Sequence, residues 1–148
     1  MRPEQKFQEL NLIMEGIDAL YHEAAKKLGV SDAEMSILYM MYEHGDGLPQ
    51  KNLYQQTGVS KTTINSSVKK MEKEGYITLK QSSLDARNTE IYMTKKGNEL
   101  LQRTVAKIVE TENAIYDGWT NEEIRMVVTL SKKYMEDFAK RIKDLGGN

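Results

Sequence analysis

The 148-residue sequence contains no cysteine, and this absence excludes several classes of site at once. Disulfide bridges, thiolate zinc sites and cysteine redox sensors all need the missing side chain. A chain that folds without disulfides suits a reducing compartment, so we expect a cytoplasmic protein. Only two histidines are present, His22 and His44, and they fall on different predicted helices. We therefore expect neither a bound metal nor another cofactor.

Long apolar runs are also absent. No run approaches the ~20 residues that a membrane-spanning helix needs, and the N-terminal MRPEQKFQEL is too polar for a secretory signal. We expect no membrane association. No nucleophile stands beside a base in a pattern typical of covalent catalysis, so the sequence does not predict an enzyme.

The sequence has little excess of either charge, with a net charge of −1, but the charges are unevenly distributed along it. Residues 1–50 carry a net charge of −5, residues 51–97 carry +5, and residues 98–148 carry −1. A basic segment inside a neutral chain favours contact with nucleic acid in that segment.

The N-terminal part predicts one amphipathic helix over residues 4–28, ending at Gly29. Its apolar residues recur at steps of three and four: Phe7, Leu10, Ile13, Met14, Ile17, Leu20, Tyr21, Ala24 and Leu28. This stripe fits packing within the domain and packing against another subunit equally well.

Three further helical signals follow. Ser31 and Glu34 form a capping-box pattern that begins a second helix, which ends at Gly45. Leu48-Pro49 predicts the opening of a short third helix with Leu53 in the core. Ser60 is a suitable N-cap for a fourth helix that ends at Gly75. Two short helices joined by a glycine-containing turn form a helix-turn-helix unit.

Two alternating stretches, residues 76–80 and 89–93, predict strands joined by the polar loop 81–88. A helix-turn-helix followed by such a hairpin is a winged helix. Thr94 then caps a long fifth helix, and Thr120 begins a sixth after a break at Gly118-Trp119. The expected fold is mainly α with a small β-hairpin wing, and it contains six helices.

The outer face of the fourth helix carries the strongest functional signal. If Ile64, Val68 and Met71 are buried, an uncharged polar and basic set faces outward, and residues 61–71 include no acidic side chain. An ordinary solvated face is usually richer in glutamate. Asn pairs with adenine through two hydrogen bonds, Ser and Thr donate or accept, and Lys reaches guanine or phosphate. The predicted DNA-binding residues of this helix are Lys61, Thr62, Thr63, Asn65, Ser66, Lys69 and Lys70.

The loop of the hairpin contains Arg87, with Asp85 two residues before it. An arginine at a hairpin tip can enter the narrow minor groove, where the negative potential is strongest. The aspartate can hold the guanidinium through paired hydrogen bonds. The alternative is a surface ion pair of little energetic value.

Four segments together resemble the MarR family, the multiple-antibiotic-resistance type of bacterial regulators. They are Val59-Ser60-Lys61-Thr62-Thr63, Met71-Glu72-Lys73-Glu74-Gly75-Tyr76-Ile77, Asp85-Ala86-Arg87 and Met93-Thr94-Lys95-Lys96-Gly97. The Asp-x-Arg loop followed by Thr-x-x-Gly is the most specific part. The order of elements matches over nearly the whole chain, and Trp119-Thr120-Asn121-Glu122-Glu123 is similar to the start of that family's last helix.

The resemblance implies a homodimer joined through the first and the last two helices. It divides the chain into a helical dimerisation region, residues 1–30 and 95–148, and a DNA-binding winged helix, residues 31–94. It also implies binding to a palindromic operator, usually as a repressor, and in many members release by a small aromatic effector. Two departures from the family pattern are Ala86, where a second basic residue is common, and Tyr54, where a small residue is usual.

Tyrosines on helices that resemble those around the family's ligand pocket are Tyr21, Tyr39, Tyr42 and Tyr116. Aromatic residues at helical spacing more often belong to a core. For the whole chain, the sequence favours a DNA-binding transcriptional regulator. The alternative is a winged helix that binds other proteins and carries a basic helix without reading DNA.

Overall fold

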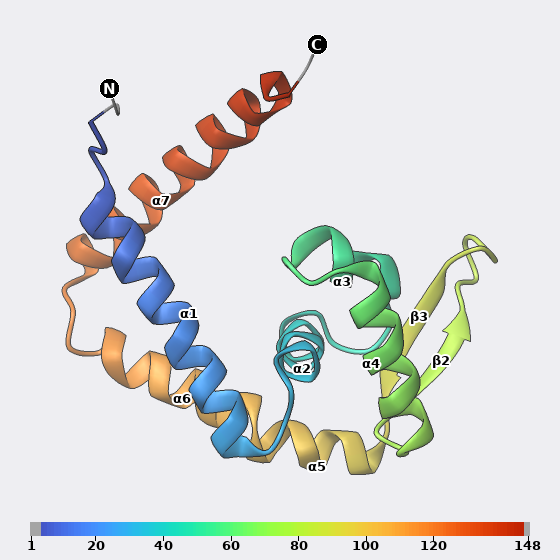
Figure 1. The fold of residues 1–148 in the computed structure, drawn as a ribbon. Coiled ribbons are helices and arrows are strands. Elements are labelled where there is room, and N and C mark those ends of the chain that lie inside the picture. Colours follow the sequence, from blue (N-terminus) through green and yellow to red (C-terminus); the bar gives the residue numbers. More distant parts are fainter. Residues whose placement is uncertain (1–3, 147–148) are drawn as a thin grey trace. The chain divides into compact units, whose positions relative to one another are not determined.

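The computed structural model describes residues 4–146, which form two compact units that divide after Ile108. The first unit contains α1 (Gln8–Leu28), α2 (Asp32–His44), β1 (Leu48–Pro49), α3 (Gln50–Gln56), α4 (Lys61–Lys73), β2 (Ile77–Gln81), β3 (Thr89–Met93) and α5 (Lys95–Arg103) (Figure 1). Helix α6 (Val105–Tyr116) crosses the division. The second unit continues with α7 (Asn121–Arg141) and a short 3-10 helix, η1 (Ile142–Asp144). The mainly helical fold with a small hairpin wing is confirmed.

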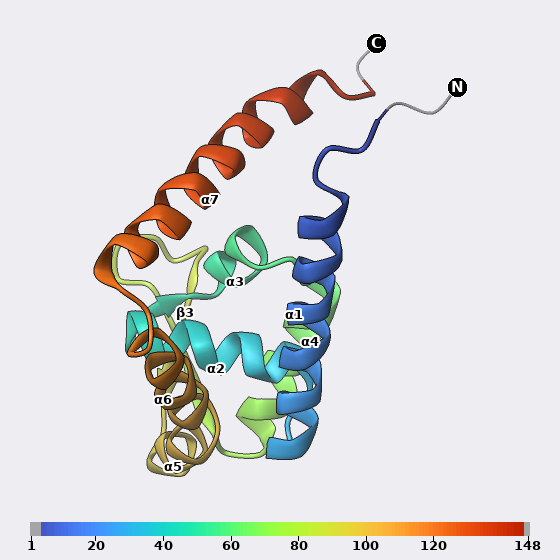
Figure 2. The same ribbon diagram turned by 90° about the vertical axis from the view of Figure 1, so that its left-hand side faces the viewer.

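Helix α2 lies at the centre of the first unit, where α1, β1, α3 and α4 all contact it (Figure 2). The core comes from α2, α3, α4, the sheet and the α5–α6 region, and its largest fully buried apolar side chains are Ile37, Leu38, Leu48, Leu53, Ile64, Val68, Met71, Ile77, Ile91 and Val105. The predicted inner face of the fourth helix and the predicted core position of Leu53 are thus confirmed. Apolar burial of this kind is the main stabilising term for the fold.

The predicted helix caps are present. Ser31 Oγ accepts from Glu34 N at 3.1 Å, and Glu34 Oε1 accepts from Ser31 N at 3.0 Å, which completes a capping box. Thr120 and Glu123 form the same arrangement at the start of α7. These bonds satisfy backbone N–H groups that have no partner inside the helix.

The prediction that Leu48-Pro49 opens the third helix is wrong, because these residues form an edge strand. Leu48 pairs with Ile91 and Pro49 with Glu90 in a sheet of order β1-β3-β2. Proline is tolerated on an edge strand because its missing N–H is not needed by a second neighbour. Helix α3 therefore begins one residue later, at Gln50.

The predicted fifth helix is divided at Thr104 into α5 and α6. Thr104 is fully buried, and its backbone leaves the helical region at φ −122° and ψ −89°. Its hydroxyl donates to the carbonyl of Leu100 at 2.7 Å, a bond of the kind that bends helices. The first helix is also shorter than predicted and begins at Gln8 instead of residue 4.

The Thr-x-x-Gly segment joins the wing to α5 through one close approach. Thr94 Oγ1 accepts from Gly97 N at 3.0 Å and donates to the carbonyl of Gly75 at 2.6 Å, with the carbonyl oxygen of Tyr76 3.0 Å away. A Cβ at position 97 would lie 1.9 Å from that same carbonyl oxygen. Glycine is therefore required here by space, although its backbone does not need a positive φ.

Large apolar side chains on α1 remain exposed, with Leu10 at 46%, Ile13 at 51% and Leu20 at 64%. Only Ala25 of this helix is buried. In the second unit, α7 has no buried residue, and Leu130 and Phe138 are exposed by 57% and 51%. No helix in the described part of the chain is both long enough and apolar enough to span a membrane.

Candidate nucleic-acid interface

Helices α3 and α4 form the predicted helix-turn-helix around a short ordered turn. The hydroxyl of Thr57 donates to the carbonyl of Leu53 and accepts from Val59 N, which fixes the turn after α3. Ser60 Oγ then accepts from Thr63 N at 3.2 Å and caps α4. These bonds hold the start of α4 in place, with its polar side directed away from the core.

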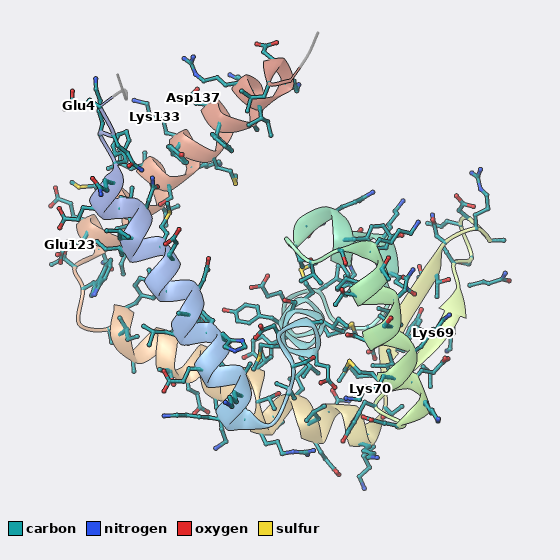
Figure 3. The ribbon with its side chains drawn as sticks, in the orientation of Figure 1. Glu4, Lys69, Lys70, Glu123, Lys133 and Asp137 are labelled. Carbon is teal, nitrogen blue, oxygen red and sulfur yellow. The ribbon has the colours of Figure 1, made fainter. Side chains whose placement is uncertain are left out.

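The outer face of α4 carries exposed side chains from most of the predicted set: Lys61, Thr62, Thr63, Ser66, Lys69 and Lys70. Figure 3 labels Lys69 and Lys70 on this helix. At 100° per residue, Thr62, Ser66 and Lys69 lie opposite the buried side of α4, Thr63 and Lys70 lie on its flank, and Lys61 lies at its N-terminal end. The structure thus brings these six predicted residues together on one helix.

Asn65 is half-buried, unlike its exposed neighbours. Its Oδ1 accepts a hydrogen bond of 2.9 Å from Nε2 of Gln50, the first residue of α3. Sequence reasoning missed Gln50, because the two residues are 15 positions apart and no local pattern links them. The sequence signal that could have found it is a polar residue in the first turn of α3, once that turn is placed correctly.

Two lysines of the set have protein partners. Lys70 Nζ lies 3.8 Å from Oε1 of Glu34, a carboxylate whose side chain is only 9% exposed. Lys61 Nζ lies 5.3 Å from the ring centroid of Tyr54. Tyr54, a departure from the family pattern, is therefore accommodated with its ring under a lysine of α4.

The wing holds Arg87 through a set of bonds to Asp85. Arg87 Nε donates to Oδ1 at 3.2 Å and its terminal nitrogen donates to Oδ2 at 3.3 Å, while the backbone N–H of Arg87 also reaches Oδ1 at 3.0 Å. The Arg87 side chain remains 90% exposed. The side-chain bond from Arg87, followed by the backbone bond, lowers the pKa of Asp85 below its ordinary value. The carboxylate is thus held in its charged form.

The rest of the loop is also ordered by its own hydrogen bonds. Ser82 N donates to the carbonyl of Asn88, and Asn88 N donates to the carbonyl of Asp85, both at 2.9 Å. Ser82 Oγ accepts from Leu84 N at 3.2 Å. The tip therefore presents Arg87 from a closed loop.

The four tyrosines proposed for a ligand site are distributed over three helices. Tyr21 on α1 and Tyr42 on α2 are exposed, Tyr39 on α2 is half-buried, and Tyr116 ends α6 in the second unit. Tyr116 packs edge-on against Trp119 with ring centroids 5.2 Å apart. The tyrosines thus occur in both units.

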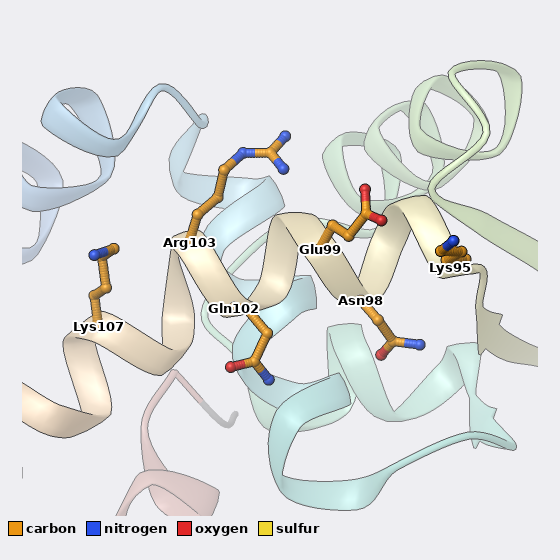
Figure 4. Close-up of a pocket in the computed structure, with 6 residues that line it drawn as sticks. All are labelled: Lys95, Asn98, Glu99, Gln102, Arg103 and Lys107. Carbon is orange, nitrogen blue, oxygen red and sulfur yellow. The ribbon is translucent and has the colours of Figure 1, made fainter.

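A shallow surface hollow of about 490 Å³ lies along α5 and the start of α6 (Figure 4). Polar and charged side chains line it: Lys95, Asn98, Glu99, Gln102, Arg103 and Lys107. Its lining includes none of the four tyrosines. Such an open, charged hollow lacks the apolar enclosure typical of sites for aromatic ligands.

Both histidines have local partners. His22 Nδ1 lies 2.7 Å from Oδ2 of Asp32, and His44 Nδ1 lies 3.2 Å from the carbonyl oxygen of Gly45. Across residues 4–146, no three His, Cys, Asp or Glu residues cluster in a way that could hold a metal ion.

The comparisons with known proteins agree in finding similarity to bacterial transcriptional regulators. Residues 28–88 match the model of the MarR family. The chain is 33% identical over 86 residues to the HTH-type transcriptional regulator Hpr of Bacillus mycoides. That match covers 52% of this chain and 46% of the relative, so the chain spans about half of the relative's length.

Two solved structures share the fold over nearly the whole chain. An uncharacterised SlyA-like transcription regulator from Listeria monocytogenes has a TM-score of 0.70 at 22% identity, with coverage of 99% of this chain and 98% of that one. The PcaV transcriptional regulator from Streptomyces coelicolor, solved in complex with its natural ligand, has a TM-score of 0.65 at 13% identity. That likeness covers 92% of this chain and 98% of PcaV.

Proposed function

We propose that this chain is a transcriptional regulator of the MarR type, which binds duplex DNA through α4 and the wing; the match of residues 28–88 to the MarR family model supports the proposal. The observation that carries the proposal is the outer face of α4. Its exposed residues are uncharged polar or basic, and acidic residues are absent from position 61 to position 71. The same segment of the chain holds the net positive charge.

In the proposed complex, α4 enters the major groove. Thr62 and Ser66 lie on its exposed face, where hydroxyl groups can contact base edges, and Lys69 is placed to reach guanine or phosphate. Arg87 enters the adjacent minor groove from the wing. Asp85 limits the rotation of the guanidinium before binding, which reduces the entropy lost on binding.

The proposed functional unit is a homodimer. Exposed apolar side chains on α1 and α7 support this, because large exposed apolar surfaces mark interaction sites. We assign residues 1–30 and 95–148 to dimerisation and residues 31–94 to DNA binding; residues 1–3 and 147–148 lie outside the described part. Two-fold symmetry then predicts a palindromic operator with half-sites about 10 bp apart, or a multiple of that.

The proposed sign of regulation is repression in the cytoplasm, with release by a small aromatic effector. PcaV, which has this fold, was solved with its natural ligand. For this chain, Tyr21, Tyr39, Tyr42 and Tyr116 are the proposed contacts. An effector acts only if it binds better to a geometry that DNA disfavours.

The test is a fluorescence-anisotropy titration of the full-length protein with DNA from upstream of its own gene. We expect binding that weakens steeply as salt rises, because phosphate contacts release counterions. Absence of salt-sensitive binding at low ionic strength would overturn the proposal and leave a winged helix that binds other proteins. If the protein binds DNA as expected, selection of bound fragments from genomic DNA would identify the operator.

A further inference from the structure

The hydrogen bond from Gln50 of α3 to Asn65 of α4 lies at the candidate DNA-binding surface and orients the Asn65 amide. We infer that Gln50 is a specificity-determining positioning residue, which orients the amide of Asn65 so that its nitrogen, and not its oxygen, is offered to DNA. This inference rests on the proposed DNA-binding function and deepens it.

The first step concerns the chemistry of the two amides. A side-chain amide has one oxygen that accepts and one nitrogen that carries two donors. Oδ1 of Asn65 accepts from Nε2 of Gln50 at 2.9 Å. Among the described residues, no protein group accepts from Nδ2 of Asn65. Both donors of this nitrogen therefore remain available to another molecule.

The second step concerns how firmly Gln50 is placed. Pro49, the preceding residue, is the N-cap of α3 and pairs with Glu90 of β3, so strand pairing ends immediately before Gln50. Asn65 follows the fully buried Ile64 on α4. Each amide is thus attached to backbone that the core and the sheet hold in place. A bond between two such groups fixes the orientation of both amides, at the cost of the rotamer freedom of the Gln50 side chain.

The third step is the consequence for base recognition. The two-point pairing of Asn with adenine uses the amide oxygen as acceptor and the nitrogen as donor together. When Gln50 occupies Oδ1 of Asn65, the Asn65 amide offers DNA mainly the two N–H donors of Nδ2. Guanine presents two adjacent acceptors, N7 and O6, in the major groove, whereas cytosine presents only a donor. We therefore expect Asn65 to favour guanine in place of adenine.

The test is the exchange Gln50→Glu in the full-length protein. A carboxylate only accepts hydrogen bonds, so it must pair with Nδ2 of Asn65 and turn Oδ1 toward DNA. The position read by Asn65 is first located as the one whose preference is lost in Asn65→Ala, by selection from a randomised operator. At that position we expect Gln50→Glu to shift the affinity ratio away from guanine and toward adenine or cytosine by roughly tenfold.

Two controls separate orientation from charge and from folding. Gln55→Glu introduces the same charge at an exposed position of α3 and should keep the guanine preference. In an Asn65→Ala background, Gln50→Glu should produce no further change in preference at that position. Circular dichroism melting of each variant establishes that the proteins compared are folded.

The inference fails if Gln50→Glu weakens binding to all sequences alike and leaves the preference unchanged, since that is the result of a structural or purely electrostatic role. It fails equally if Asn65→Ala alters no position of the selected site. A measurement on the free protein separates this failure from that of the proposed function. Gln50→Glu should move the Asn65 side-chain amide resonance in ¹⁵N NMR spectra, and an unmoved resonance overturns the inference even where DNA binding is intact.

Discussion

Helices α4 and α7 have the same kind of amphipathic pattern in the sequence, yet their apolar faces differ in burial. The three apolar residues that define the inner side of α4, Ile64, Val68 and Met71, are at most 1% exposed. Helix α7 has more apolar residues and buries none of them: Ile124 is half-buried, and Val127 and Leu130 are exposed by 42% and 57%. The apolar face of α4 is thus buried within the winged-helix region, whereas the apolar face of α7 is not buried within the chain.

This contrast teaches that periodicity identifies the apolar face of a helix but not the surface that covers it. In α4 the face meets α2 and β2 of the same chain. On α1 and α7 the faces remain exposed in the chain by itself, and the homodimer proposed above supplies their cover. Two substitutions test this difference in burial between α7 and the winged-helix region. Two more test the wing that the buried core supports.

The largest effect is expected from Leu130→Asp on α7. If a second copy covers this side chain, two-fold symmetry places two unpaired carboxylates in one interface. An uncompensated buried charge costs roughly 3–5 kcal/mol, so sedimentation velocity should show monomers. Thr129→Asp, the same change at the neighbouring exposed position, should remain a dimer. A Leu130→Asp protein that stays dimeric would show that this part of α7 lies outside the interface.

The second effect breaks the winged-helix region itself. Gly97→Ala places a Cβ 1.9 Å from the carbonyl oxygen of Tyr76, so the start of α5 and the start of the wing must separate. Overpacking of this kind costs about 1–3 kcal/mol, measured by urea denaturation. Gly58→Ala is the matched control, because a Cβ there meets nothing within 4 Å. Equal stability of the two variants would contradict the close approach.

The third effect is a change in DNA affinity that leaves the stability of the fold unchanged. Arg87→Ala should weaken DNA binding to most sequences alike and reduce the slope of log affinity against log salt by about 1, because one cationic contact is removed. Arg125→Ala removes the same charge from an exposed position on α7 and should leave the slope unchanged. Loss of sequence preference, instead of uniform weakening, would indicate that Arg87 reads bases directly.

The smallest effect is a change in acid stability at the wing. Arg87 lowers the pKa of Asp85, so the ionised pair stabilises the fold above the ordinary pKa of 3.8 and loses that contribution as pH falls through the lowered value. Asp85→Asn should therefore melt slightly below the parent protein at neutral pH and converge with it in strong acid. Asp18→Asn on α1 serves as control, and thermal melts across pH give the comparison. A gap that widens in acid would be the wrong sign.

Local chemistry made much of this fold predictable. The capping boxes at Ser31 and Thr120, the glycine that ends α1 and the inner side of α4 are all recorded within a few neighbouring residues. The same holds for the pairing of Asp85 with Arg87, since the two residues are two positions apart in one loop. Short-range patterns with a definite spacing carry such information directly.

Features that depend on distant partners were not predictable in this way. Leu48-Pro49 satisfies the rule for a helix start, and only its pairing with β3 reveals a strand. The break at Thr104 has neither glycine nor proline to mark it; burial and a bond to Leu100 decide it. The bond from Gln50 to Asn65 joins two helices whose relative placement no local pattern encodes.

The contact between Gly97 and the carbonyl of Tyr76 also has a consequence for mutational tolerance. In a library of random substitutions selected for folding alone, position 97 should be strongly enriched in glycine, since every other amino acid carries a Cβ that crowds the carbonyl and lowers stability. Positions 62 and 66 are exposed, and they should tolerate many residues under that selection and few when DNA binding is selected. Selecting one library for folding and again for DNA binding would thus separate the residues needed for the fold from those needed for DNA contact.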